Sequence, residues 1–195
     1  MLAITGLILA GGRGKRMGSV DKGLQRFNGQ PMALHVLQRL SPQVDQVAIN
    51  ANQNLPTYAA ICAAVWPDMM TGFAGPLAGL QSGLMHCQTP YLVTVPCDSP
   101  FVPNDLVERL HAGMQAAAAD LAVAVTGPPD QRQSHPVFCL AKTVLLPHLT
   151  DFLKNGGRKF DAWYATLAVA EVHFADDTGF RNINTVDDLQ RFEKP

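Results

Sequence analysis

A glycine-rich, basic segment is the first part of the sequence whose residue types could do chemistry. The stretch LAGGRGKRMGSVDKG, residues 9–23, contains five glycines and four cationic side chains. Glycines let backbone N–H groups approach an anion closely, and cations attract a triphosphate. The stretch fits neither the Walker A pattern nor the GxGxxG fingerprint, because Arg16 follows Gly14-Lys15 and Met17 stands where the last glycine would be. The sequence therefore predicts a phosphate-binding loop of a third kind. The alternative is a flexible surface turn with solvated cations.

An acidic residue follows another apolar run. In VTVPCDSPFVP, a predicted buried strand delivers Asp98 to the edge where the glycine loop begins, provided that the two strands lie side by side. One or two carboxylates together with substrate phosphates are the ligands that Mg²⁺ prefers, so Asp98 is a predicted metal ligand. A helix-capping aspartate is the alternative, but Asn104 or Asp105 is better placed for that role.

Several single positions are predicted to line the same crevice. Asn50 and Asn52 follow an apolar run, and their amides could pair with a base edge, a ribose hydroxyl or a phosphate, although asparagine is also common in turns. Asp68 suits either a turn or a further polar contact. Asn182 and Asn184 precede a predicted helix capped by Thr185, and for Asn184 local turn bonding is the alternative. The remaining candidates are Gly75, Pro76 and Gly79, which open a helix whose unpaired N–H groups suit a carbonyl or an anion.

The elements that must position these residues alternate along the chain. Apolar runs predict strands, and patterned segments between them predict helices. The predicted strands are 4–11, 46–52, 91–98, 120–125, 135–141 and 168–175, and the predicted helices are 31–40, 56–65, 76–87, 103–119 and 143–157. Because parallel strands need crossover connections, this order predicts an α/β three-layer sandwich with a mainly parallel sheet.

Composition excludes several classes of protein. The 195 residues suit one domain, and a net charge of -1 argues against nucleic-acid binding. The four cysteines and six histidines show no zinc spacing, and there is neither a signal peptide nor a stretch of the roughly 18–20 apolar residues that a membrane span needs. We therefore expect a cytoplasmic protein that uses neither nucleic acid nor a membrane as a partner.

With LAGGRGKRMGSVDKG, PLAG, PCDSP and NINT in this order, together with Asn50 and Asn52, the chain closely resembles the molybdenum cofactor guanylyltransferases. The resemblance runs nearly end to end. It implies a Rossmann-like fold of the nucleotide-diphospho-sugar transferase type, with a nucleotide half at about 1–119 and an acceptor half at about 120–195. It also implies transfer of GMP from GTP to the terminal phosphate of Mo-molybdopterin, with release of pyrophosphate.

The resemblance also implies roles for individual residues. Nucleotide contacts fall on Leu9, Ala10, Gly11, Gly12, Lys22, Asn50, Asp68 and Asp98, with Asp98 as the Mg²⁺ ligand. Arg16, Lys22 and Asp98 would be catalytic, whereas Asn182 and Asn184 would lie at the acceptor site. Molybdenum-insertion proteins and apo-molybdoenzymes are the protein partners that the family suggests.

Other functions stay open at this point. One is that of a cytidylyl- or sugar-phosphate nucleotidyltransferase, and another is that of a nucleotide-binding regulator without turnover. Asp98 argues against the regulator, since simple binding needs no dedicated metal ligand at that edge. A phosphate monoester that attacks another phosphate is already ionised at neutral pH, so no general base is required.

Overall fold

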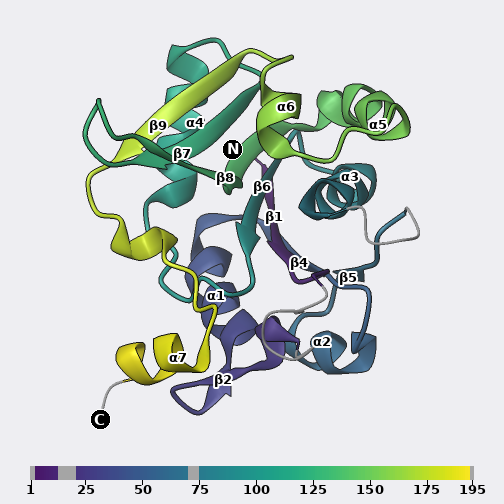
Figure 1. Ribbon diagram of the computed structural model, residues 1–195. Helices are drawn as coiled ribbons and strands as arrows, with labels where there is room; N and C mark the ends of the chain where they lie inside the picture. Colours follow the sequence, from purple (N-terminus) through teal and green to yellow (C-terminus); the bar gives the residue numbers. More distant parts are fainter. Residues whose placement is uncertain (1–2, 13–20, 70–74, 194–195) are drawn as a thin grey trace.

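The computed structural model describes residues 3–12, 21–69 and 75–193, and within them seven strands form one sheet (Figure 1). The strands are β1 (Ile4–Leu9), β4 (Gln46–Asn50), β5 (Val65–Trp66), β6 (Tyr91–Pro96), β7 (Leu121–Thr126), β8 (Gln133–Lys142) and β9 (Val169–Phe174). The order across this sheet is β5-β4-β1-β6-β8-β7-β9. Among these seven strands, only β8 runs antiparallel to its neighbours, β6 and β7, so the prediction of a mainly parallel sheet is confirmed.

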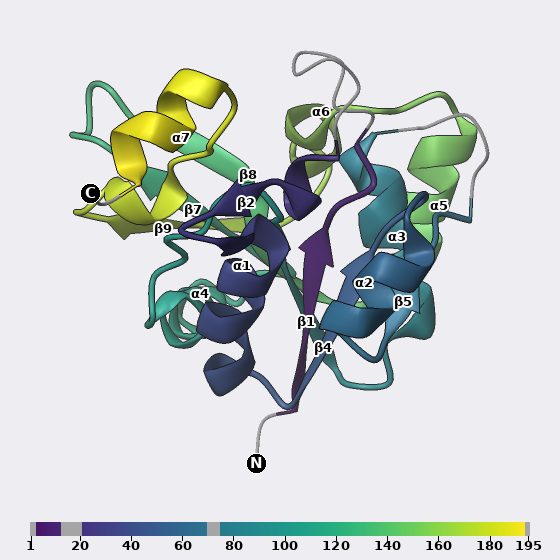
Figure 2. The same ribbon diagram turned by 90° about the horizontal axis from the view of Figure 1, so that it is seen from below.

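Helices cover both faces of the sheet, as Figure 2 shows, which confirms the three-layer architecture. Alternate residues of β1 point to opposite faces, so that Ile8 packs on one layer while Leu7 and Leu9 pack on the other. The helices are α1 (Met32–Leu40), α2 (Leu55–Ile61), α3 (Pro76–His86), α4 (Leu106–Ala116), α5 (Leu146–Lys154), α6 (Phe160–Tyr164) and α7 (Val186–Phe192). Helices α1 and α4 contribute to the first layer, and α3, α5 and α6 to the second. None of the described helices is long and apolar enough to cross a membrane.

A small hairpin outside the main sheet packs against the C-terminal segment of the chain. Strands β2 (Arg26–Phe27) and β3 (Gln30–Pro31) form a hairpin around Asn28-Gly29, whose φ angles of 46° and 79° suit the tight turns of short hairpins. Phe27 packs in a cluster with Ile183 and Leu189. This cluster holds α7 and the segment before it next to the residues that follow the glycine loop.

The structure differs from the prediction in the extent of two helices and in three short elements. The helix predicted over 56–65 ends at Ile61, and Val65–Trp66 forms the edge strand β5, whose two residues are too short to show an alternating pattern. The helix predicted over 103–119 spans only Leu106–Ala116, because Ala118 turns into the left-handed region at φ 48°. The sequence does not predict the short elements β2, β3 and α6, since each lacks a full period of apolar residues.

Candidate functional site

A pocket of about 410 Å³ lies at the carboxyl ends of β1, β4 and β6. The register explains why these ends converge, because Leu9 is paired with Asn50 on one side and with Pro96 on the other. The pocket is lined by Leu9, Ala10, Gly11, Gly12, Lys22, Asn50, Asp68, Gly75, Pro76, Pro96, Cys97, Asp98 and Val137. The structure thus brings together all eight residues to which the resemblance assigns nucleotide contacts, and Gly75 and Pro76 with them. Asn52 and Gly79, which the sequence also predicts to line the crevice, do not line this pocket. Arg16, with the rest of residues 13–20, lies outside the described residues.

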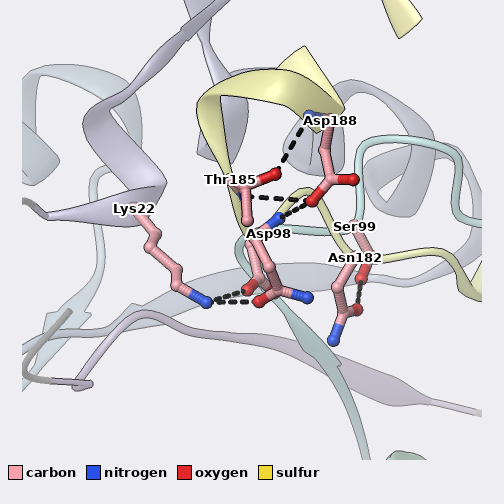
Figure 3. Close-up of polar contacts among 7 residues, drawn as sticks. Lys22, Asp98, Ser99, Asn182, Thr185 and Asp188 are labelled. Carbon is pink, nitrogen blue, oxygen red and sulfur yellow. Dashed lines mark hydrogen bonds and ion pairs between the residues drawn. The ribbon is translucent and has the colours of Figure 1, made fainter. Parts of the chain in front are cut away.

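Lys22 lines this pocket and makes two polar side-chain contacts. Its ammonium donates to Asp98 Oδ2 at 3.0 Å, and Figure 3 shows the two side chains pointing toward each other from separate elements. The same ammonium donates to Asn184 Oδ1 at 2.6 Å. The Lys22 and Asp98 side chains are 22% and 11% exposed, so the pair is screened from bulk solvent but open to a ligand. Asn184 is therefore not confined to local turn bonding.

The segment before α7 is fixed in place by a capping box, which Figure 3 displays. The backbone N–H groups of Asn184 and Thr185 donate to Asp188 Oδ2, each at 3.0 Å, and the Asp188 N–H donates to the Thr185 hydroxyl at 3.1 Å. Hydrogen bonds from Thr185 and Asn184 lower the pKa of Asp188. The expected cap at Thr185 is confirmed. Asp188 was not predicted from the sequence as the second member of the capping box, although the spacing Thr-x-x-Asp is typical of such a box.

The same segment is also tied to the end of β6. The Ile183 N–H donates to the Asp98 carbonyl at 2.8 Å, and the Ser99 hydroxyl donates to Asn182 Oδ1. These contacts join residues more than 80 positions apart in the chain. They place the segment that carries Asn182 and Asn184 beside the end of β6.

On the opposite wall, Asp68 is held by two asparagine amides. Asn50 Nδ2 donates to Asp68 Oδ1 at 2.9 Å and Asn52 Nδ2 donates to Asp68 Oδ2 at 2.8 Å, while the Asp68 N–H returns a hydrogen bond to Asn52 Oδ1. Asn50 also donates to the Trp66 carbonyl at 2.9 Å. The carboxylate of Asp68 thus has a fixed orientation at the pocket wall. Asn52 supports it from behind and does not itself line the pocket.

Two small residues leave room for this network. A Cβ on Gly11 would lie 2.8 Å from Asn52 Nδ2, and a Cβ on Gly79 would lie 2.4 Å from Asn50 Oδ1. Side chains at these positions would collide with the asparagine amides. The glycines are therefore explained by close approach to Asn50 and Asn52.

A second pocket, of about 510 Å³, adjoins the first and shares Pro96 and Val137 with it. Its polar lining comes mostly from beyond residue 130 and includes His135, Arg181, Asn182, Asn184 and Arg191. Burial lowers the pKa of His135, against an opposing effect of Asp177, which favours a neutral imidazole at this wall. The Lys22-Asn184 contact lies at the junction of the two pockets.

A cation at this site would depend on Asp98. Within the described part of the chain, no three His, Cys, Asp or Glu side chains gather in a way that could hold a metal ion. The Asp98 carboxylate nevertheless fits Mg²⁺, because that ion commonly takes one or two protein carboxylates and completes its shell with phosphate oxygens and water. Asp68, the other carboxylate of the pocket lining, accepts hydrogen bonds from the Asn50 and Asn52 amides. The residues present are thus compatible with a metal that arrives with a nucleotide.

Comparison with known proteins agrees with this architecture. The profile of the MobA-like NTP transferase domain matches residues 6–169. A molybdenum cofactor guanylyltransferase of Bordetella petrii is 56% identical over 188 residues, which is 96% of each chain. The protein of the same name from Ralstonia nicotianae is 56% identical over 193 residues, covering 96% of this chain and 95% of the relative.

Solved structures show the same fold at lower identity. Molybdopterin-guanine dinucleotide biosynthesis protein A from Archaeoglobus fulgidus superimposes with a TM-score of 0.78 at 23% identity, covering 96% of this chain and 95% of that one. A 4-diphosphocytidyl-2C-methyl-D-erythritol synthase from Anaerococcus prevotii gives a TM-score of 0.76 at 12% identity, covering 97% and 96%. With the full-length matches to curated relatives, these comparisons show that the chain belongs to the molybdenum cofactor guanylyltransferase family of nucleotidyltransferases.

Proposed function

We propose that this protein transfers GMP from GTP to the terminal phosphate of Mo-molybdopterin and releases pyrophosphate. The observation that carries the proposal is the Lys22-Asp98 pair inside a pocket lined by Gly11, Gly12 and the ends of three strands. The names of relatives at 56% identity supply the guanylyl group and the molybdenum cofactor. The joining of GMP to an acceptor phosphate follows from the general chemistry of nucleotidyl transfer.

On the nucleotide side, the backbone of Leu9, Ala10, Gly11 and Gly12 would contact GTP, and Asn50 and Asp68 would make further nucleotide contacts. Lys22 would bind the phosphates with its ammonium, and Arg16 would add a second cation there. Asp98 would hold Mg²⁺, which neutralises charge on the triphosphate when it is bound. These assignments are supported by the pocket that the assigned residues line together. Arg16 is the exception, because it lies outside the residues that the structure describes.

The reaction needs charge neutralisation more than proton transfer. A terminal oxygen of the acceptor phosphate attacks the α-phosphorus of GTP, a new P–O bond forms, and the bond to the β-phosphate breaks so that pyrophosphate leaves. Two anions approach each other in this step, and preorganised cations stabilise the charge that develops. Lys22 is suited to this task, because Asp98 and Asn184 hold its ammonium at the pocket junction.

On the acceptor side, we infer that the second pocket takes the pterin with its terminal phosphate directed toward Lys22. Asn182 and Asn184 lie on the wall nearest Asp98, as an acceptor phosphate next to GTP requires. This arrangement supports a nucleotide half at about 1–119 and an acceptor half at about 120–195. Hand-over from molybdenum-insertion proteins, delivery to apo-molybdoenzymes and a cytoplasmic location are part of the same proposal.

Ligand-dependent unfolding tests the nucleotide choice. With Mg²⁺ present, GTP should raise the midpoint of thermal unfolding more than CTP, ATP or UTP, since a ligand at about 100 times its dissociation constant stabilises a protein by roughly 2.7 kcal/mol. Pyrophosphate release with GTP and Mo-molybdopterin then tests turnover. Stabilisation by CTP alone would contradict the guanylyl assignment, and binding without pyrophosphate release would identify a regulator.

Gly79→Ala should weaken GTP binding, because its new Cβ would lie 2.4 Å from Asn50 Oδ1 and displace an amide that holds Asp68. Lost hydrogen bonds of this kind cost about 1–3 kcal/mol, which predicts a dissociation constant raised roughly tenfold. Isothermal titration with GTP measures this constant. Gly83→Ala is the matched control: it lies in the same helix and is equally crowded, with its Cβ 2.4 Å from Leu7 Cδ2, but it faces the core. Equal weakening in both variants would mean that general strain in α3 is responsible.

A further inference from the structure

Lys22 is held at its backbone as well as at its ammonium. It opens the short 3-10 helix Lys22–Leu24, and its carbonyl accepts the Gln25 N–H at 3.1 Å. The carbonyl of the preceding residue, Asp21, accepts the Leu24 N–H at 3.2 Å. Asp21 is only 8% exposed, which is unusual for an aspartate. The mechanism proposed above gives this carboxylate no role, so its burial calls for an explanation.

Both oxygens of the Asp21 carboxylate are bound by the α2 region. The Tyr58 hydroxyl donates to Oδ1 at 2.5 Å, and Asn54 Nδ2 donates to Oδ2 at 3.0 Å. Tyr58 is fully buried in α2, and Asn54 immediately precedes that helix. The contacts join residues 37 and 33 positions apart, and α2 is otherwise remote from the Lys22-Asp98 pair in sequence.

The chain on the other side of Lys22 is equally constrained. A Cβ on Gly23 would lie 2.5 Å from the Tyr58 hydroxyl oxygen and 3.2 Å from Cys97 Cβ. The backbone at Gly23 is thus pressed between the phenol and the residue next to Asp98. The Tyr58 hydroxyl consequently contacts the segments on both sides of Lys22.

The protonation states suit this arrangement. Burial raises the pKa of Tyr58, and the neighbouring Cys97 and Asp21 raise it further, so the phenol stays protonated and donates. A hydrogen bond from a neutral donor to an ionised carboxylate is among the stronger kinds in proteins. The contact therefore acts as a firm anchor, with no proton transfer required.

We propose that Asp21, anchored by Tyr58 and Asn54, is a positioning residue that holds Lys22 in line with Asp98 and Asn184. The inference rests on the proposed function, because it assigns the anchor a purpose only if Lys22 acts on the nucleotide phosphates. A lysine side chain has a long flexible stem, and small errors in the placement of a catalytic group cost rate steeply. Fixing the backbone from which the stem starts limits the positions that the ammonium can take.

Tyr58→Phe removes the anchoring hydroxyl and keeps the ring. In the pyrophosphate-release assay with GTP and Mo-molybdopterin, kcat should fall roughly tenfold, while the dissociation constant for GTP should change less than about threefold. Asp21→Ala should behave in the same way. Asp21→Asn should retain most of the activity, since an amide oxygen can still accept from Tyr58 and the Asn54 amide can turn to match the new group.

A double-variant comparison separates positioning from general stability. If Tyr58 acts through Lys22, then adding Tyr58→Phe to Lys22→Ala should lower the residual rate no further, because the group being positioned is gone. Tyr91→Phe is the matched control: Tyr91 begins β6 at the far end of the strand, its hydroxyl accepts from Gln115, and the variant should keep the wild-type kcat.

The outcomes distinguish the two proposals. Wild-type protein that neither binds GTP nor releases pyrophosphate would contradict the proposed function. With an active wild type, an unchanged kcat in Tyr58→Phe would overturn the positioning role. A further tenfold loss on top of Lys22→Ala would overturn it too, because the hydroxyl would then act independently of Lys22.

Discussion

Replacing Asp98 by alanine should lower the rate of pyrophosphate release at least about 100-fold while leaving the fold intact. Removal of one preorganised electrostatic group from an active site costs about 3 kcal/mol or more of transition-state stabilisation, which corresponds to this loss. Asp98 lines the proposed nucleotide pocket, and its carboxylate is the proposed Mg²⁺ ligand and the acceptor of a hydrogen bond from Lys22. The fold should survive because the backbone carbonyl at position 98 can still accept the hydrogen bond from the Ile183 N–H.

The structure offers a matched control for this variant. Lys142 and Asp120 form an ion pair of the same kind at 2.9 Å, near the opposite end of the sheet, where Lys142 is aligned with Tyr91. Asp120→Ala should retain close to wild-type turnover, and both variants should keep the wild-type circular dichroism spectrum. Near-wild-type turnover in Asp98→Ala would contradict its assignment as a metal ligand.

Replacing Lys22 by methionine should have the second-largest effect, a loss of roughly 100-fold in kcat/KM. Methionine keeps much of the stem volume but removes the charge that would meet the phosphates. It also leaves Asp98 without its cationic partner in a largely buried setting. Steady-state kinetics with GTP as the varied substrate, joined with titration of GTP, measure the loss in rate and in affinity separately.

Two further variants sharpen the result. Lys22→Arg should recover only part of the activity, because a planar guanidinium cannot occupy the point between Asp98 and Asn184 that an ammonium fills. Lys142→Met removes the lysine of the control pair and should leave kcat/KM within about twofold, as surface pairs contribute little. If Lys22→Met and Lys142→Met behaved alike, Lys22 would have no special role in the pocket.

The sequence by itself determined the central sheet and the nucleotide side of the site. Apolar runs predict the main strands, and parallel strands end at a common edge, so the residues that follow β1, β4 and β6 have to meet there. This local logic is enough to bring the glycine loop together with Asn50 and Asp98, and the register of the three strands confirms it. The sequence also predicts that Lys22, at the end of this loop, lies at the same edge, but it does not predict that Asn184 contacts the Lys22 ammonium.

Only the tertiary structure decided which distant residues complete the site. Asn184 reaches Lys22 across 162 positions, and Tyr58 reaches Asp21 from a helix whose sequence shows no chemical signal. These contacts depend on where the segment before α7 lies and on how α2 packs. Neither arrangement produces a periodic pattern of apolar residues in the sequence. Local patterning of apolar residues fixes strands and loops, but the partners of a polar side chain are set by the packing of elements far apart in the chain.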